Sequence, residues 1–309
     1  MKKFFLILLF LILLAFGGLA FMFYKSFDED SYKAQVIAST KELIGRQMVI
    51  NGQFSLDLFP SPVIKISDVV IKNKAGEKDP DFIKIASVEA HIRFASLFKN
   101  PLIIENIILN EPEIFLSRNE KGNNNWDLSF FKTFDKAIIQ DNLIGKAFVD
   151  LPPQFQNMEL KNGKISYQNV LTGKSFQLTD INGKMKSTSI NGPFDFTGSF
   201  VNEQMPIDAT LHVDKLNLTS QTKFTLSLLN PDSKAVLSVQ NGVLERISDS
   251  TQTISGGFTF NIPQLASFLA TYKDFKDLPE ALNKQVLGNG NFSFSAKETS
   301  FKDVAVRYG

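Results

Sequence analysis

The chain has 309 residues, of which 43% are hydrophobic, so it can bury a sizeable core as one large β unit or as two ordinary domains. Its 33 basic and 32 acidic side chains nearly cancel, which argues against nucleic acid or another polyanion as its main partner. The chain contains no cysteine, so disulfides, thiolate metal sites and cysteine nucleophiles are excluded.

The first feature in chain order is an uncharged apolar run from Phe4 to Phe23. As a helix, this run is long enough to cross a hydrocarbon core of ~30 Å. Lys2 and Lys3 precede it, so the positive-inside bias keeps the N-terminus in the cytoplasm and sends the rest of the chain across the membrane. A cleaved signal peptide, with Gly18–Ala20 as its cleavage site, is the alternative, but the run exceeds the usual apolar region of roughly 7–15 residues. We therefore predict a cytoplasmic tip and a transmembrane anchor over residues 1–24.

Residues 25–46 are predicted to form an amphipathic stalk helix. Tyr32, Val36 and Leu43 share one helical face, the acidic residues that begin at Asp28 suit a helix N-terminus, and Gly45 fits a C-cap. The apolar face of this helix would either dock on the β region that follows or lie on a lipid surface.

Alternating apolar and polar residues after position 47 predict strands. One apolar face contains Phe54, Leu56 and Leu58, and after the break at Phe59–Pro62 the alternation resumes with Ile64 and Ile66. A later segment repeats the pattern with Val88, Ile92 and Phe94. Such a face either lines an open groove or fills a sealed core, and the alternation is the same in both cases.

Asn-Gly pairs, which favour two-residue hairpin turns, occur six times in the chain. They are Asn51-Gly52, Asn162-Gly163, Asn182-Gly183, Asn191-Gly192, Asn241-Gly242 and Asn289-Gly290. As hairpin turns they predict a mainly β fold with a long antiparallel, curled, groove-like sheet of about a dozen strands. Two segments, 130–149 and 262–286, have helical spacing instead and are expected to be the few helices that cover the sheet.

Residues that could carry out chemistry are sparse. His91 and His212 lie on the polar side of alternating segments and are expected to be solvated side chains, not metal ligands. The segment Thr172–Ser175 lacks the earlier glycine of a phosphate-binding loop, so this segment is expected to be a hairpin turn. The asparagine-rich segment Asn119–Leu128 lacks the EF-hand order of ligands and is expected to be a polar loop before a buried Trp126. We therefore predict a protein that is not an enzyme and has no cofactor or metal site.

Several short motifs, in this order, resemble those of the AsmA family. They are Leu43–Arg46, Ile50–Gly52, Leu58–Pro62, Ile104–Pro112, Asn125–Leu128, Met158–Tyr167 and Leu178–Ile181. The resemblance covers nearly the whole chain, although Ile44 stands where the family usually has threonine. Family members are commonly longer, so the resemblance implies a short or truncated copy.

The resemblance implies a single-pass protein of the Gram-negative inner membrane, with its bulk in the periplasm and a role in outer-membrane biogenesis and lipid homeostasis. It divides the β part into a first AsmA-like region at 47–150 and a second, C-terminally truncated one at 151–309. The family is similar to bridge-like lipid carriers, so the expected ligand is phospholipid or another molecule with acyl chains. The expected groove residues are Phe54, Leu56, Leu58, Ile64, Ile66, Val88, Ile92 and Phe94. A periplasmic scaffold or chaperone-like factor, with outer-membrane assembly proteins as partners, is the alternative function.

Overall fold

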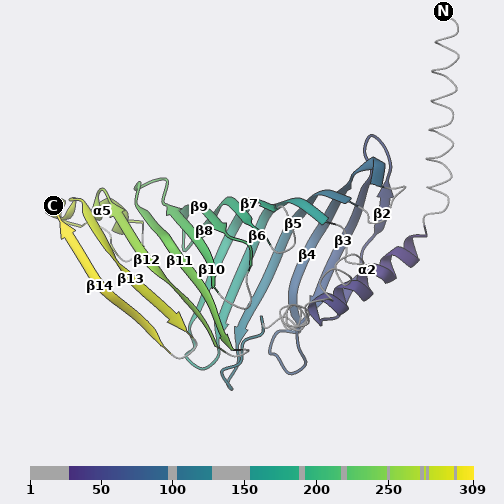
Figure 1. Ribbon diagram of the computed structural model, residues 1–309, viewed down its shortest axis with the longest axis horizontal. Coiled ribbons are helices and arrows are strands. Elements are labelled where there is room, and N and C mark those ends of the chain that lie inside the picture. The colour runs from purple at the N-terminus through teal and green to yellow at the C-terminus, as the bar shows by residue number, and fades with distance from the viewer. Residues whose placement is uncertain are drawn as a thin grey trace, which may run out of the picture.

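The computed structural model describes residues 28–96, 103–126, 154–187, 192–216, 221–248, 251–271, 275, 278–295 and 298–309. Within these residues the chain forms one curved sheet of 14 strands, with helix α2 (Glu29–Ile44) beside its N-terminal end (Figure 1). The fold is mainly β, and the number of strands is close to that expected from the Asn-Gly pairs.

The elements follow one another along the sheet. The strands are β1 (Met48–Ile50), β2 (Phe54–Asp57), β3 (Val63–Lys72), β4 (Asp81–Ile92), β5 (Ile103–Arg118), β6 (Gln154–Asn169), β7 (Ser175–Ser187), β8 (Phe194–Asn202), β9 (Met205–Val213), β10 (Gln221–Leu229), β11 (Val236–Ser248), β12 (Thr251–Ile262), β13 (Val286–Ser295) and β14 (Thr299–Tyr308). The short helices are η1 (Phe94–Ser96), α5 (Leu265–Leu269) and η2 (Glu280–Leu282).

The order of strands follows the sequence, and β1 and β2 both pair with β3. The pairs are antiparallel except for β5 and β6, which run parallel. The expectation of a purely antiparallel meander is therefore wrong at this pair, because parallel neighbours need a crossover instead of a hairpin. The sheet continues through β5 and β6, the strands on either side of the expected boundary at residue 150.

Paired residues form rows that cross the whole sheet, and two adjacent rows differ sharply in polarity. The row that we call the trough row is Phe54, Ile66, Val88, Leu109, Leu160, Gly183, Gly198, Ala209, Leu228, Leu237, Phe260, Gly288 and Val306. The next row, the outer row, is Ser55, Lys65, Glu89, Ile108, Glu159, Lys184, Thr197, Thr210, Ser227, Ser238, Thr259, Asn289 and Ala305. Because side chains alternate between the two faces of a sheet, one face is apolar across its full width and the other is mostly polar.

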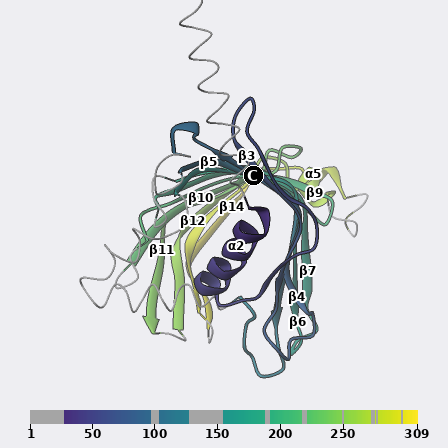
Figure 2. The same ribbon diagram turned by 90° about the vertical axis from the view of Figure 1, so that its right-hand side faces the viewer.

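The strands bend near their middles, where residues with positive φ interrupt the regular pairing. Asp68 in β3, Glu111 in β5 and Asn162 in β6 have φ between 50° and 54°, and the residues that flank them are paired across β3, β4, β5 and β6. Bulges of this kind bend a strand and increase its twist. Aligned across neighbouring strands, they curl the sheet into a trough, and α2 lies inside the curve (Figure 2).

Four of the six Asn-Gly pairs lie inside strands, so the expectation that they form hairpin turns is wrong for these four. They are Asn162-Gly163 in β6, Asn182-Gly183 in β7, Asn241-Gly242 in β11 and Asn289-Gly290 in β13. Shifts of register occur at or beside each of them. Asn51-Gly52 links β1 to β2, but both of these strands pair with β3 and not with each other, so this pair is not a hairpin turn either. Asn191 lies outside the described residues. The expected hairpin turn at Thr172–Ser175 is confirmed, with Gly173 at φ 69° between β6 and β7.

Glycine is required inside the strands because aromatic rings lie against it. A Cβ on Gly183 would come closer than 3.0 Å to the ring of Phe196, and one on Gly242 would meet the ring of Phe224 in the same way. Gly288 stands in the same relation to Phe260. A glycine inside a strand often marks such a close approach, and the ring covers the backbone that the glycine leaves bare. Phenylalanine and glycine together therefore build the floor of the trough.

The predicted stalk helix is confirmed as α2, with Gly45 as its C-cap at φ 65°. Its side chains Tyr32, Val36 and Ile37 pack on the apolar cluster of β1, β2 and β3, so the helix docks on the sheet. Of the expected helical segment 262–286, the described residues form the short α5 and η2. Segment 130–149 lies outside the described residues.

None of the helices in the described part of the chain combines the length and the apolar character that crossing a bilayer requires. The run Phe4–Phe23, on which the predicted anchor depends, lies outside that part.

Gly198→Ala is expected to destabilise the protein. A Cβ at this position would overlap the carbonyl oxygen of Asn182 and come within 2.8 Å of the Cα of Gly183, and backbone atoms cannot rotate away. Overpacking of this kind costs about 1–3 kcal/mol, which thermal unfolding measured by circular dichroism should report as a lower Tm. Gly257→Ala is the matched control, because its nearest neighbour would be the Asn291 side chain at 3.6 Å. Equal Tm values for the two variants would contradict the assignment of this close approach.

Candidate functional site: an apolar trough

The apolar face is most continuously buried at its N-terminal end, although single residues further along, such as Ala209 and Val239, are buried as well. Side chains at the N-terminal end, such as Phe54 at 5% exposure and Ile66 at 7%, form the core beneath α2. Further along the same row, Leu237 is 38% exposed and Val306 is 61% exposed. In the described part of the chain, no second layer of strands covers this face. The concave side of the sheet is therefore an apolar surface on which large side chains become exposed beyond the part that α2 covers.

The lining changes in kind along the trough. From β3 to β6 it is aliphatic, as at Ile107, Leu109 and Ile114. From β8 to β13 phenylalanine dominates; the rings on this face are Phe194, Phe196, Phe200, Phe224, Phe258, Phe260, Phe292 and Phe294. Several of them contact one another, for example Phe292 and Phe294 with ring centroids 5.1 Å apart. Both kinds of lining are apolar, and polar residues on the same face, such as Ser187 and Thr222, are buried.

The residues expected to line a groove lie at the closed end of the trough. Phe54, Leu56, Ile66 and Ile92 are buried, while Ile64 and Val88 are partly buried against the cluster that α2 covers. Leu58 lies just after β2, and Phe94 lies in η1, 40% exposed, at the edge of the sheet. At this end the apolar face contacts a helix of the same chain, so an open surface must be sought further along the sheet.

The open part of the lining was not identified from the sequence as a site. Its members, such as Leu226, Ile254 and Phe294, alternate with polar residues in the same way as those near the N-terminus. The difference is that α2 packs on the N-terminal part of the face and does not reach these residues, which only the arrangement in space reveals.

A buried polar cluster fixes the end of α2 to the sheet. Arg46, which is 4% exposed, stacks on the Phe82 ring with its guanidinium carbon 4.1 Å from the centroid. Its guanidinium donates to the side chain of Asn73 at 3.0 Å and to the backbone carbonyl of Asn125. Buried charges persist in proteins only where hydrogen bonds compensate for lost solvation. The cluster therefore joins two stretches of chain that are 79 positions apart.

Asn125, not Trp126, is the buried residue of the asparagine-rich loop. Asn125 is fully buried: its side chain donates to the carbonyl of Phe115 at 2.7 Å and accepts from the Ser117 amide at 2.8 Å. Trp126 is 36% exposed and packs against Tyr167 with ring centroids 5.9 Å apart. The expectation of a buried tryptophan is therefore wrong, because the amide of Asn125 satisfies two backbone groups of β5 that an indole could not.

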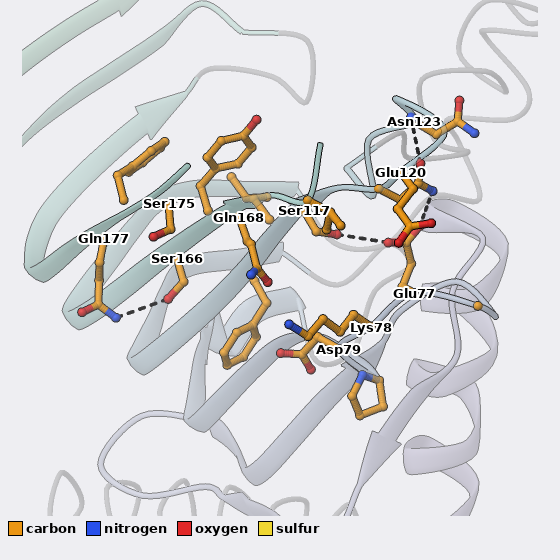
Figure 3. Close-up of a pocket in the computed structure, with 18 of the residues that line it drawn as sticks. Glu77, Lys78, Asp79, Ser117, Glu120, Asn123, Ser166, Gln168, Ser175 and Gln177 are labelled. Atoms are coloured by element: carbon orange, nitrogen blue, oxygen red, sulfur yellow. Dashed lines mark hydrogen bonds between the residues drawn. The ribbon is translucent and has the colours of Figure 1, made fainter. Parts of the chain in front are cut away.

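A separate hollow lies where loops and the ends of β5, β6 and β7 meet. It has a volume of about 1400 Å³ and a mixed lining (Figure 3). Glu77 accepts from Ser117 at 3.1 Å, and Gln177 donates to Ser166 at 3.4 Å. Because carboxylate, hydroxyl and amide groups bond to one another here, the hollow does not show the apolar character that an acyl chain requires.

The two histidines lie on the outer face, as expected. His212 contacts Asp195 at 2.6 Å and Asp214 at 3.2 Å, and hydrogen bonds to these carboxylates, the one to Asp195 first, raise the pKa of His212 above its usual value. Among the described residues, no group of three His, Asp or Glu side chains is placed so that it could hold a metal ion.

The structure defines the class of protein: a single curled β-sheet whose concave face is a long apolar trough, closed at one end by a docked helix. The chain belongs to the AsmA family, whose model matches residues 1–246. A comparison with curated proteins found no match. Two stretches that carry the resemblance, Leu43–Arg46 and Asn125–Leu128, are the stretches that the buried Arg46 joins.

Asn125→Ala is expected to loosen the docked helix and lower the stability of the protein. The substitution leaves two backbone groups of β5 without partners, at about 1–3 kcal/mol for each buried group. Hydrogen exchange should then show faster exchange in α2 and β1 as well as in β5, because the loop whose backbone carbonyl accepts from Arg46 loses the side-chain bonds that fix it to β5. Asn124→Ala, at the exposed neighbouring position, should leave exchange unchanged. If exchange in α2 and β1 did not respond to Asn125→Ala, the cluster would not be what holds the helix.

Proposed function

We propose that this protein is an inner-membrane-anchored AsmA-family factor of cell-envelope biogenesis that shelters the acyl chains of phospholipid in its trough. The observation that carries the proposal is the trough row, in which every residue from Phe54 to Val306 is apolar while the adjacent outer row is mostly polar. A solvent-exposed apolar face of this extent normally binds a partner or a ligand.

The energetics favour acyl chains as that ligand. Each methylene removed from water gains ~0.8 kcal/mol, so sheltering a sixteen-carbon chain requires an apolar surface that supplies ~12 kcal/mol. Strands ~4.8 Å apart make a sheet of this many strands ~60 Å wide, which is ample length for chains that lie across the strands. Such binding needs no catalytic residue and no cofactor, since shape and apolarity suffice.

The open side of the trough suits an amphipathic ligand. A sealed cavity would have to solvate a headgroup inside the protein, whereas a trough leaves the headgroup in water while the chains lie on the floor. The trough is closed by α2 at one end and exposes large side chains beyond the part that α2 covers, so a ligand would have more room along β5–β14 than at the residues first expected to bind it.

The proposed location follows from the sequence. The apolar run Phe4–Phe23 would anchor the chain in the inner membrane, with Lys2 and Lys3 in the cytoplasm and the sheet in the periplasm. Influence on outer-membrane assembly would then follow from lipid supply to the envelope.

Leu237→Asp is expected to reduce the amount of phospholipid that co-purifies with the full chain in mild detergent, measured by lipid extraction and mass spectrometry. The variant places a charge on the floor of the trough, where Leu237 is 38% exposed and paired with Leu228 and Phe260. Ser238→Asp is the matched control, because the next residue of β11 points to the outer face between Ser227 and Thr259.

Equal lipid content in the two variants, or a wild-type protein that never carries lipid, would contradict the proposal. The second of these outcomes would favour the alternative of a scaffold for outer-membrane protein assembly, whose apolar face contacts protein.

A further inference from the structure

One edge of the sheet, formed by the ends of its strands, carries an unusually exposed aromatic side chain on a fixed loop. The loop that joins β2 to β3, residues Leu58–Pro62, is called the β2–β3 tip. Phe59 at its apex is 91% exposed, the highest value among the exposed large hydrophobic side chains of the described residues. Single exposed hydrophobic residues are common, so the position and the support of this one have to carry the argument.

The tip is held rigidly at its base. Pro62 is fully buried, and its carbonyl accepts a hydrogen bond of 2.8 Å from the amide of Ile92 at the end of β4. Asp57 and Lys65 form an ion pair of 2.7 Å across the strands that enter and leave the tip. Because the backbone on both sides is paired, Phe59 cannot be withdrawn by a simple collapse of the loop onto the sheet.

A second aromatic residue lies on the same edge. Ile92, which is paired near the start of β5 and only 3% exposed, ends β4, and two residues later Phe94 in η1 is 40% exposed. Phe54 and Leu56 of β2, both 5% exposed, lead directly into the tip. The apolar face of the sheet therefore continues without a polar break into the exposed rings at this edge.

The path of the chain would bring the predicted membrane anchor to this edge. The C-terminal end of α2 lies at the opposite edge, because Arg46 bonds to Lys72 and Asn73 where β3 ends. A helix of 16 residues is ~24 Å long, so its first turn at Glu29 lies toward the edge at which β3 begins, on the side of the tip. The 27 residues before Asp28 include the apolar run Phe4–Phe23. A bilayer that holds this run would lie close to the start of α2.

We propose that the β2–β3 tip inserts Phe59 into the interface of the bilayer in which the chain is anchored, and so holds the N-terminal end of the sheet at the surface from which lipid reaches the open part of the trough. Aromatic side chains prefer the membrane interface, and a rigid loop delivers one there with little loss of conformational freedom. This inference rests on the proposed function for the role of the contact, but the contact itself is tested separately.

The test uses the single tryptophan of the sequence, Trp126. In the full chain with Trp126→Phe, a new tryptophan is introduced by Phe59→Trp and the protein is reconstituted into phosphatidylethanolamine and phosphatidylglycerol vesicles with brominated acyl chains. Emission from position 59 should shift to the blue and be quenched severalfold more strongly than in vesicles without bromine. The matched control is Leu171→Trp in the same background, at a residue that is 55% exposed at the β6–β7 turn on the opposite edge, and its emission should be unaffected by bromine.

Equal, weak quenching at positions 59 and 171 would overturn the inference. Blue-shifted emission from position 59 without quenching would also overturn it, because the ring would then be shielded by protein, for instance a second copy of the chain. Circular dichroism spectra and Tm values that match those of the Trp126→Phe background would show that both tryptophan variants are folded.

A second measurement separates this contact from lipid binding. Phe59→Ser should slow the transfer of a fluorescent phospholipid from vesicles to the protein severalfold, while the amount of lipid that co-purifies with the chain stays the same. An unchanged rate would count against the inference and leave the proposed function standing. If the wild-type chain carried no co-purifying lipid while position 59 was strongly quenched, the membrane contact would stand and the proposed function would be rejected.

Discussion

The structure depends on the bending of its long strands over a floor of glycine and phenylalanine. Rings such as Phe196 and Phe224 lie where a side chain on Gly183 or Gly242 would stand, and residues of positive φ interrupt the pairing at matching levels of β3, β5 and β6. A sheet of this width without such bends would be an open, gently twisted surface, and its apolar side would seek another sheet. With them, the apolar side becomes the inside of a curve. The curvature thus lets a large hydrophobic face exist without a second layer of strands.

The two ends of the trough differ because of one helix and one buried arginine. Helix α2 supplies Tyr32, Val36 and Ile37 to the core over β1–β3, and Arg46 fixes its end to Asn73 and Asn125. These contacts connect two separate stretches that carry the resemblance to the AsmA family. The connection orients the closed end of the trough relative to the N-terminal part of the chain, from which the predicted membrane anchor extends.

Much of this fold was predictable from local patterns. The period of two identified the strands, and the capping signals around Asp28 and Gly45 identified α2, because both follow from short-range sterics and side-chain direction. The role of the Asn-Gly pairs was not predictable. A pair such as Asn162-Gly163 can adopt the positive φ that both a hairpin turn and a bulge require. Only the pairing with a neighbouring strand decides which of the two forms. The parallel pairing of β5 with β6 was hidden for the same reason, since pairing is a long-range property.

The site was only partly predictable. Residues such as Phe54 and Ile66 were correctly placed on an apolar face, but alternation cannot tell which part of that face a helix will cover. The open lining at Leu237 and Ile254 has the same local pattern, and its exposure depends on contacts made tens of residues away. Likewise, the buried member of the loop after β5 is Asn125, because two backbone groups of β5 require its amide.

The central claim is that the concave face of the sheet is open to acyl chains. The most direct test reconstitutes the unmodified full chain with a phospholipid that carries a photoreactive group near the end of one acyl chain, followed by irradiation and mass-spectrometric mapping of the adducts. The account predicts adducts on trough-facing residues of β5 to β13, such as Leu226 and Phe258, and none on their outward-facing neighbours Thr225 and Thr259. Adducts spread equally over both faces, or absent from the concave face, would contradict it.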